Sequence, residues 1–143
     1  MTTNRPGEAL TLAQPVLREI LEHAAEGAPS EVCGLLAGSA GYATRAFRIL
    51  NIAASPDSAY VMHPAEQVRA LYAMEAEGLD LAGIYHSHPP GSQAEPSPTD
   101  LAQATWPGTP YVIVVPPAEG RPAQIRAFLI GVGAQQEIPV WRE

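Results

Sequence analysis

Residues 81–100 read LAGIYHSHPPGSQAEPSPTD, and this stretch decides the fold that we expect for the chain. Its first eight residues, 81–88, are a mostly apolar run that ends in His86 and His88, which predicts a buried strand with both histidines at its end. A loop rich in proline follows. Ser97 then begins a short helix through about residue 105, because serine is a preferred N-cap and proline is favoured at the first helical position. This order of elements indicates an α/β domain.

On both sides of this stretch, apolar residues recur with helical or strand spacing. We expect helices at 12–26 and 64–78, and strands at 31–38, 42–53, 109–117, 124–131 and 136–142. The first two strands should form a hairpin through 39–41, and Pro139 indicates that the last strand lies at a sheet edge. The whole chain, 1–143, is then one mixed-sheet α/β domain with flanking helices and a loose N-terminus at 1–9. In the second helix, the side chains expected to face the core are Val68, Leu71, Tyr72 and Met74.

The composition suits a soluble protein with one core. The chain has 143 residues, 46% of them hydrophobic, and its only cysteine, Cys33, indicates a reducing compartment. We find neither a signal peptide nor an apolar run long enough to cross a bilayer, so we expect a cytoplasmic protein. The formal net charge of −7 argues against nucleic acid or an anionic membrane as the main partner.

The histidine pair is a candidate metal site. In a strand, His86 and His88 face the same side, about 6.6 Å apart along the backbone, while Ser87 faces the other. Two imidazoles at this spacing can bind one zinc ion, each at about 2.0–2.1 Å. The alternative is a polar strand end with two solvated histidines, and an H-x-H pair alone does not decide between the two.

Ser97 and Asp100 also allow two interpretations. An acid three residues after a serine N-cap resembles a capping box, in which neither residue has a chemical role. However, a helix that begins beyond the same strand end can direct Asp100 toward the histidines as a third metal ligand. Three protein ligands with an open fourth position are typical of catalytic zinc, whereas structural zinc takes four ligands, mostly cysteine.

A hydrolytic zinc site also needs a base that is not a ligand. Glu31, at the start of the apolar strand 31–38, is the candidate, and the alternative is that Glu31 is merely the exposed first residue of that strand. Among the remaining candidates, we expect His23 on the surface of the first helix, His63 at the start of the second helix, and Cys33 as a small buried residue.

Taken together, these residues resemble the JAMM, or MPN+, metalloprotease family, whose motif is an early glutamate, H-S/T-H-P, a proline-rich loop and S-x-x-D. This chain has Glu31, the run His86-Ser87-His88-Pro89, and the run Ser97-Pro98-Thr99-Asp100. The resemblance covers nearly the whole chain from about residue 12 and implies a cytidine-deaminase-like fold. One departure is the loop at 89–96, which has eight residues where the family usually has seven.

The resemblance implies a role for each matching residue. His86, His88 and Asp100 would hold one Zn²⁺ per chain, Glu31 would be the general base, and Ser97 would donate a hydrogen bond to the oxyanion. It further implies a peptidase or isopeptidase that cleaves after the C-terminal diglycine of a ubiquitin-like or sulfur-carrier protein, and it allows a homodimer.

Three other functions compete with this one. The zinc nucleoside deaminases share the fold and the glutamate base, but they need a P-C-x-x-C pair that this sequence lacks. A non-haem Fe(II) enzyme uses the same ligand types, usually in the order H-x-D/E…H, and would leave Glu31 without a role. A catalytically silent MPN scaffold is the alternative from a different class, and such a scaffold should tolerate Glu31→Gln.

Overall fold

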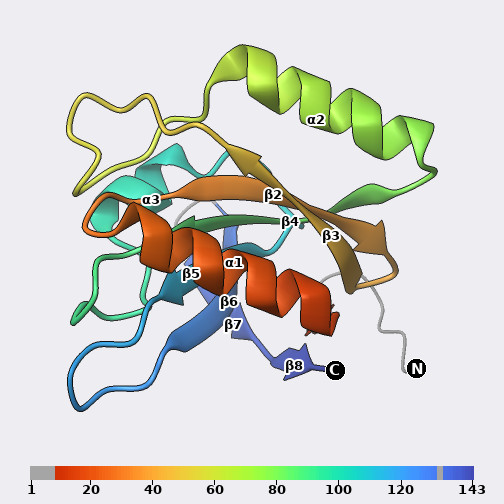
Figure 1. Ribbon diagram of the computed structural model, residues 1–143. Helices are drawn as coiled ribbons and strands as arrows, with labels where there is room; N and C mark the ends of the chain where they lie inside the picture. The colour runs from red at the N-terminus through yellow and green to blue at the C-terminus, as the bar shows by residue number, and fades with distance from the viewer. Residues whose placement is uncertain (1–8, 132–133) are drawn as a thin grey trace.

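The computed structural model describes residues 9–131 and 134–143. These residues form a mixed sheet with helices packed against it, as the sequence predicts (Figure 1). The elements are β1 (Leu10–Leu12), α1 (Gln14–Gly27), β2 (Cys33–Ser39), β3 (Tyr42–Ile49), α2 (Pro64–Ala76), β4 (Asp80–Ser87), α3 (Pro98–Gln103), β5 (Tyr111–Val115), β6 (Gln124–Gly131), β7 (Ala134–Ile138) and β8 (Val140–Arg142).

The strand that carries the histidines lies in the middle of the sheet. The strand order is β7-β6-β5-β4-β2-β3-β1-β8, in which β4 runs antiparallel to β2 and parallel to β5. All five residues of β5 are buried, as expected for a continuous apolar run between two neighbours. His86 therefore has paired strands on both sides, opposite Cys33 of β2 and Ile113 of β5.

The two faces of the sheet have separate cores, covered by α1 on one side and α2 on the other (Figure 1). Neighbouring residues of β4 face opposite cores: Tyr85 packs in the cluster with α1, and Ile84 packs in the cluster with α2. Because side chains alternate along a strand, His86 lies on the same face as Ile84. The candidate site is thus on the α2 face.

Several boundaries differ from the prediction. The strand β1 was missed, because three residues give no usable periodicity, and β3 ends at Ile49 rather than at residue 53. The predicted strand 136–142 is two strands that meet at Pro139. They pair at opposite edges of the sheet, so the chain crosses from one edge to the other there, and the Pro139 carbonyl accepts a hydrogen bond from Leu10 N at 2.9 Å. The expected edge position is therefore confirmed for both β7 and β8.

The inward face of α2 was predicted wrongly in part. Val68 and Tyr72 are 49% and 69% exposed, and Ala70 and Met74 are the buried residues of this helix. The residues of each pair are four apart, so α2 carries two short stripes of apolar side chains, Val68 with Tyr72 and Ala70 with Met74. The second stripe packs against the sheet, because the small Ala70 allows a close approach. The hairpin at 39–41 is confirmed, with Ala40 and Gly41 at positive φ.

At the N-terminus, the expected loose segment 1–9 lies outside the described residues except for Ala9, which is buried. Within the described residues, no helix is both long and apolar enough to span a membrane.

Candidate metal centre

The end of β4 directs its side chains to alternate sides, as the sequence predicts. His86 and His88 face one side, whereas the Ser87 hydroxyl turns to the other and accepts a hydrogen bond from Val32 N at 2.8 Å. The Ser87 N–H donates to the Val32 carbonyl at 2.9 Å, so pairing with the chain before β2 continues past the assigned strand. This pairing places Glu31 opposite His88.

The start of α3 presents Asp100 to the histidines. Ser97 is the N-cap: its Oγ accepts from Asp100 N at 3.0 Å, and Asp100 Oδ2 accepts from Ser97 N at 2.9 Å. These two bonds form a complete capping box. The same Oδ2 atom lies beside both imidazoles, so the cap and the contact with the histidines are made by one carboxylate.

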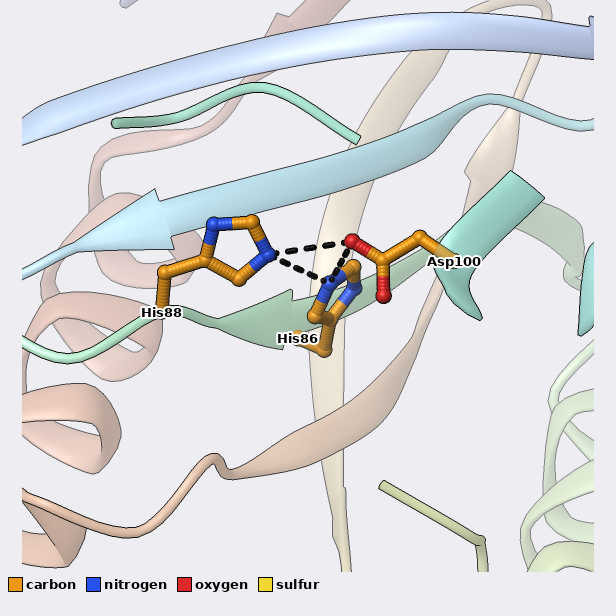
Figure 2. Close-up of side chains that lie close together, drawn as sticks. All are labelled: His86, His88 and Asp100. Atoms are coloured by element: carbon orange, nitrogen blue, oxygen red, sulfur yellow. Dashed lines mark hydrogen bonds and ion pairs between the residues drawn. The ribbon is translucent and has the colours of Figure 1, made fainter. Parts of the chain in front are cut away.

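Three potential ligand atoms converge at one point (Figure 2). Asp100 Oδ2 lies 3.1 Å from His86 Nε2 and 3.0 Å from His88 Nε2, and the two Nε2 atoms are 3.2 Å apart. Tetrahedral ligands at about 2.0–2.1 Å from one ion lie about 3.3 Å from each other. Two imidazole nitrogens and a carboxylate oxygen, all buried, therefore fit a single small divalent cation.

The tautomer of His88 supports this use of Nε2. His88 Nδ1 is 2.8 Å from the Gln93 carbonyl, which can only accept, so Nδ1 donates there and Nε2 is the ring nitrogen available to a metal ion at the centre. Gln93 belongs to the proline-rich loop 89–96. That loop therefore orients the His88 imidazole.

The charges around the centre differ from one residue to the next. Burial opposes ionisation of Asp100, but its hydrogen bonds with His86 and His88 outweigh burial and hold its pKa well below the usual range. For His88, burial is outweighed by the hydrogen bonds to Asp100 and Gln93, which raise the pKa. Burial lowers the pKa of His86, and the hydrogen bond with Asp100 offsets only part of this effect.

Glu31 lies in the segment before β2 rather than at the start of that strand, and it is 6% exposed, so the interpretation of an exposed strand end is wrong. Burial raises the pKa of Glu31 to about 7, with a smaller raising effect from Asp100 and an opposing one from His88. Its Oε1 atom has no hydrogen-bond partner among the described residues. An unpaired, buried carboxyl group with a pKa near neutrality is typical of a general base.

Tyr60 was not singled out in the sequence, yet it contacts the centre. Its ring stacks on the His86 imidazole, with ring centroids 4.5 Å apart and planes at 23°. Tyr60 also lines a pocket of about 270 Å³ together with Met62, Trp106 and Tyr111. No periodicity marks the segment between β3 and α2, so only its aromatic residue could have drawn attention.

The remaining candidates are not part of the group of three converging atoms. The expected surface position of His23 is wrong: it is half-buried, its Nδ1 is 2.6 Å from the Tyr85 hydroxyl, and burial lowers its pKa to about 4. His63 caps α2 and accepts from Glu66 N at 3.3 Å, as predicted. Cys33 is fully buried, and burial raises its pKa to about 12, which confirms its expected packing position.

Comparisons with known proteins find relatives of this chain. A family model described as prokaryotic homologs of the JAB domain matches residues 13–131. A desampylase from Haloferax volcanii is 46% identical over 122 residues, covering 81% of this chain and 84% of the relative. A probable TtuB-protein conjugate cleaving protease from Thermus thermophilus is 39% identical over 134 residues, covering 94% and 84%. The crystal structure of a JAB1/MPN domain protein from Archaeoglobus fulgidus shares the fold, with a TM-score of 0.56, 24% identity, and coverage of 92% and 95%.

Proposed function

The chain belongs to the prokaryotic JAB-domain family of JAMM-type hydrolases, and from this premise we propose that it is a zinc-dependent peptidase. Its substrate in this proposal is a ubiquitin-like or sulfur-carrier protein extended or conjugated beyond its C-terminal diglycine. The names of two relatives, a desampylase and a conjugate-cleaving protease, support cleavage of protein conjugates.

The observation that carries the proposal is the separation of ligand and base. Three ligand atoms lie within 3.2 Å of one another, whereas Glu31 stays outside this group with a pKa of about 7. His86, His88 and Asp100 would hold the zinc ion. Zinc would supply Lewis-acid polarisation of the scissile carbonyl and lower the pKa of water to about 7.

Two residues of the chain would then assist the reaction, Glu31 by transferring protons and Ser97 by donating a hydrogen bond. Glu31 accepts a proton from the attacking water and delivers it to the nitrogen of the leaving amine, so the base is regenerated in each turnover. Ser97 Oγ already accepts from Asp100 N, which leaves its own O–H free to donate to the oxyanion of the tetrahedral intermediate. Ser97 forms no covalent bond with the substrate, and its capping role is compatible with this donation.

The pocket beside Tyr60 suits an extended tail. Met62 and Asn51 form an isolated antiparallel bridge, in which Ile52 N donates to Val61 O and His63 N donates to Leu50 O. In such a pair, the N–H and C=O groups of Met62 point away from Asn51. Met62 also lines the pocket. We therefore assign the diglycine segment to the side of Met62 that faces away from Asn51, where the segment would add as a strand.

The test uses intact-mass analysis of a ubiquitin-fold carrier with a peptide appended after its diglycine, and of the same carrier joined to a lysine side chain. The samples are the wild type, the chelator-treated protein with and without added zinc, Glu31→Gln, and the matched control Glu22→Gln on the exposed face of α1. We expect cleavage after the diglycine by the wild type, the zinc-restored protein and Glu22→Gln alone.

Two results would contradict the proposal. Cleavage by Glu31→Gln at the wild-type rate would remove the proposed base. Absence of cleavage of both substrates by zinc-loaded wild type would overturn the peptidase assignment and favour the scaffold interpretation.

A further inference from the structure

The two candidate ligand histidines are held in different ways. His88 donates from Nδ1 to the Gln93 carbonyl at 2.8 Å. His86 is more deeply buried, and its Nδ1 has no hydrogen-bond partner among the described residues. Metal-binding histidines almost always donate their second ring N–H to an acceptor, which fixes the ring orientation. Something else must fix the ring of His86.

The ring of Tyr60 occupies the place where such support is needed. It lies against the His86 imidazole with centroids 4.5 Å apart and planes at 23°, a stacked geometry. On the sheet side, His86 is enclosed by its paired neighbours Cys33 and Ile113. The stack therefore restricts rotation of an imidazole that no hydrogen bond from Nδ1 restrains.

The Asn51 side chain holds the backbone on both sides of Tyr60. Asn51 Nδ2 donates to the carbonyls of Glu31 and Ala59, at 2.8 and 3.0 Å. Asn51 Oδ1 accepts from the N–H groups of Ala53 and Val61, both at 3.0 Å. All four hydrogen-bonding positions of the amide are used, and two of them fix the residues directly before and after Tyr60.

We propose that Tyr60 is a positioning residue, which orients His86 for the metal by stacking and thereby replaces the missing acceptor at Nδ1. This inference rests on the metal centre of the proposed function. Asn51 supports the arrangement twice, because it fixes the backbone on both sides of Tyr60 and also binds the carbonyl of Glu31. The ring plane matters in this role, and the hydroxyl does not.

The experiment compares Tyr60→Phe and Tyr60→Leu with the control Tyr72→Leu, which changes an exposed tyrosine of α2. Zinc affinity is measured by competition with a chromophoric chelator, and the visible spectrum of the cobalt-substituted protein reports the ligand geometry. Thermal melts of the metal-free proteins check the fold. None of these readouts depends on a protein substrate.

We expect Tyr60→Phe and Tyr72→Leu to keep zinc affinity within about threefold of the wild type and to leave the cobalt spectrum unchanged. Tyr60→Leu should weaken zinc binding by about 10–100-fold, the range seen when a partner of a ligand histidine is removed, and should alter the cobalt bands. Rescue by phenylalanine separates stacking from the loss of the hydroxyl. If Tyr60→Leu does not fold, Tyr60→Met takes its place under the same criteria.

Wild-type zinc affinity and an unchanged cobalt spectrum in Tyr60→Leu would overturn the inference. Equal weakening in Tyr60→Phe and Tyr60→Leu would also overturn it, because the ring would then not be the cause. Failure of the proposed function looks different: zinc-loaded wild type would cleave no substrate, while zinc would still bind more weakly to Tyr60→Leu than to Tyr60→Phe and the wild type.

Discussion

The start of α3 and the segment that leads into β2 each bring one carboxylate to the same centre, and the two carboxylates behave in opposite ways. Asp100 interacts with Ser97 N and with both imidazoles, which together keep its pKa well below the usual range. Glu31 is equally buried, but its Oε1 has no partner among the described residues, and burial raises its pKa to about 7. Hydrogen bonding, and not residue type, thus sets the pKa values of the two carboxyl groups apart, which suits the roles of ligand and base that we propose for them.

We expect the largest effect from neutralising Asp100, the carboxylate that interacts with Ser97 N and both histidines. Asp100→Asn keeps an oxygen that can accept from Ser97 N, so the cap of α3 persists, but the negative charge is lost. We expect zinc affinity to fall by more than about 100-fold, beyond the range for residues that only support a ligand, and cleavage to stop. Titration with a zinc indicator and the cleavage assay check this expectation.

The matched control is Asp80→Asn at the exposed far end of β4, which should leave both measurements unchanged. If Asp100→Asn bound zinc within about threefold of the wild type and still cleaved, Asp100 would be a capping residue only, and the contrast with Glu31 would disappear.

A smaller effect is expected at Ser97, which tests whether the start of α3 has a role beyond capping. Ser97→Ala should lower kcat about 10²–10³-fold through loss of the oxyanion donor, and should cost about 1 kcal/mol of stability through loss of the cap. The comparison is His63→Ala, because His63 caps α2 in the same way and is also followed by proline. His63→Ala should lower the melting temperature without an effect of that size on kcat. A similar loss of stability and an unchanged kcat in both variants would reduce Ser97 to a cap.

The sequence predicted the start of α3 better than it predicted the surroundings of Glu31, and the reason is physical. A serine cap, a proline and an acid act within one helical turn, so the tetrapeptide at 97–100 specifies its own conformation. The histidine pair follows from strand alternation, which is equally local. The burial of Glu31 depends on the segment between β3 and α2, which closes over it through Asn51 and the Pro56 carbonyl. No periodic pattern describes that segment.

The same distinction explains the other errors. Val68 and Tyr72 have helical spacing, and only the packing of α2 against the sheet shows that the stripe of Ala70 and Met74 is the buried one. The contact of Tyr60 with His86 joins residues that are far apart in the sequence, so no local pattern could reveal it.

The last expected effect concerns the stability of the metal-free protein rather than zinc binding or catalysis. The Glu31 carboxyl has an ordinary pKa of 4.5 and a pKa of about 7 in the folded chain. Below pH 4.5 it is protonated whether the chain is folded or not, and it costs nothing. As the pH rises from about 4.5 to about 7, the unfolded chain ionises this carboxyl freely whereas the folded chain must ionise it in a buried position, so stability is lost over this window. Asp100 has the opposite sign, because its lowered pKa stabilises the fold above its ordinary value of 3.8 and this contribution is lost as the pH falls.

Glu31→Gln resembles the protonated acid at every pH and should therefore remove the loss caused by Glu31 while leaving that caused by Asp100. We expect the melting temperatures of wild type and variant to agree near pH 4.5, and the variant to melt about 10 °C higher at pH 8, because a pKa raised from 4.5 to about 7 corresponds to about 3 kcal/mol. Melts in the presence of chelator measure this difference, with Glu22→Gln as the control. A difference that does not change with pH would mean that Glu31 is already paired in the folded chain, and the contrast between the two carboxylates would then have another cause.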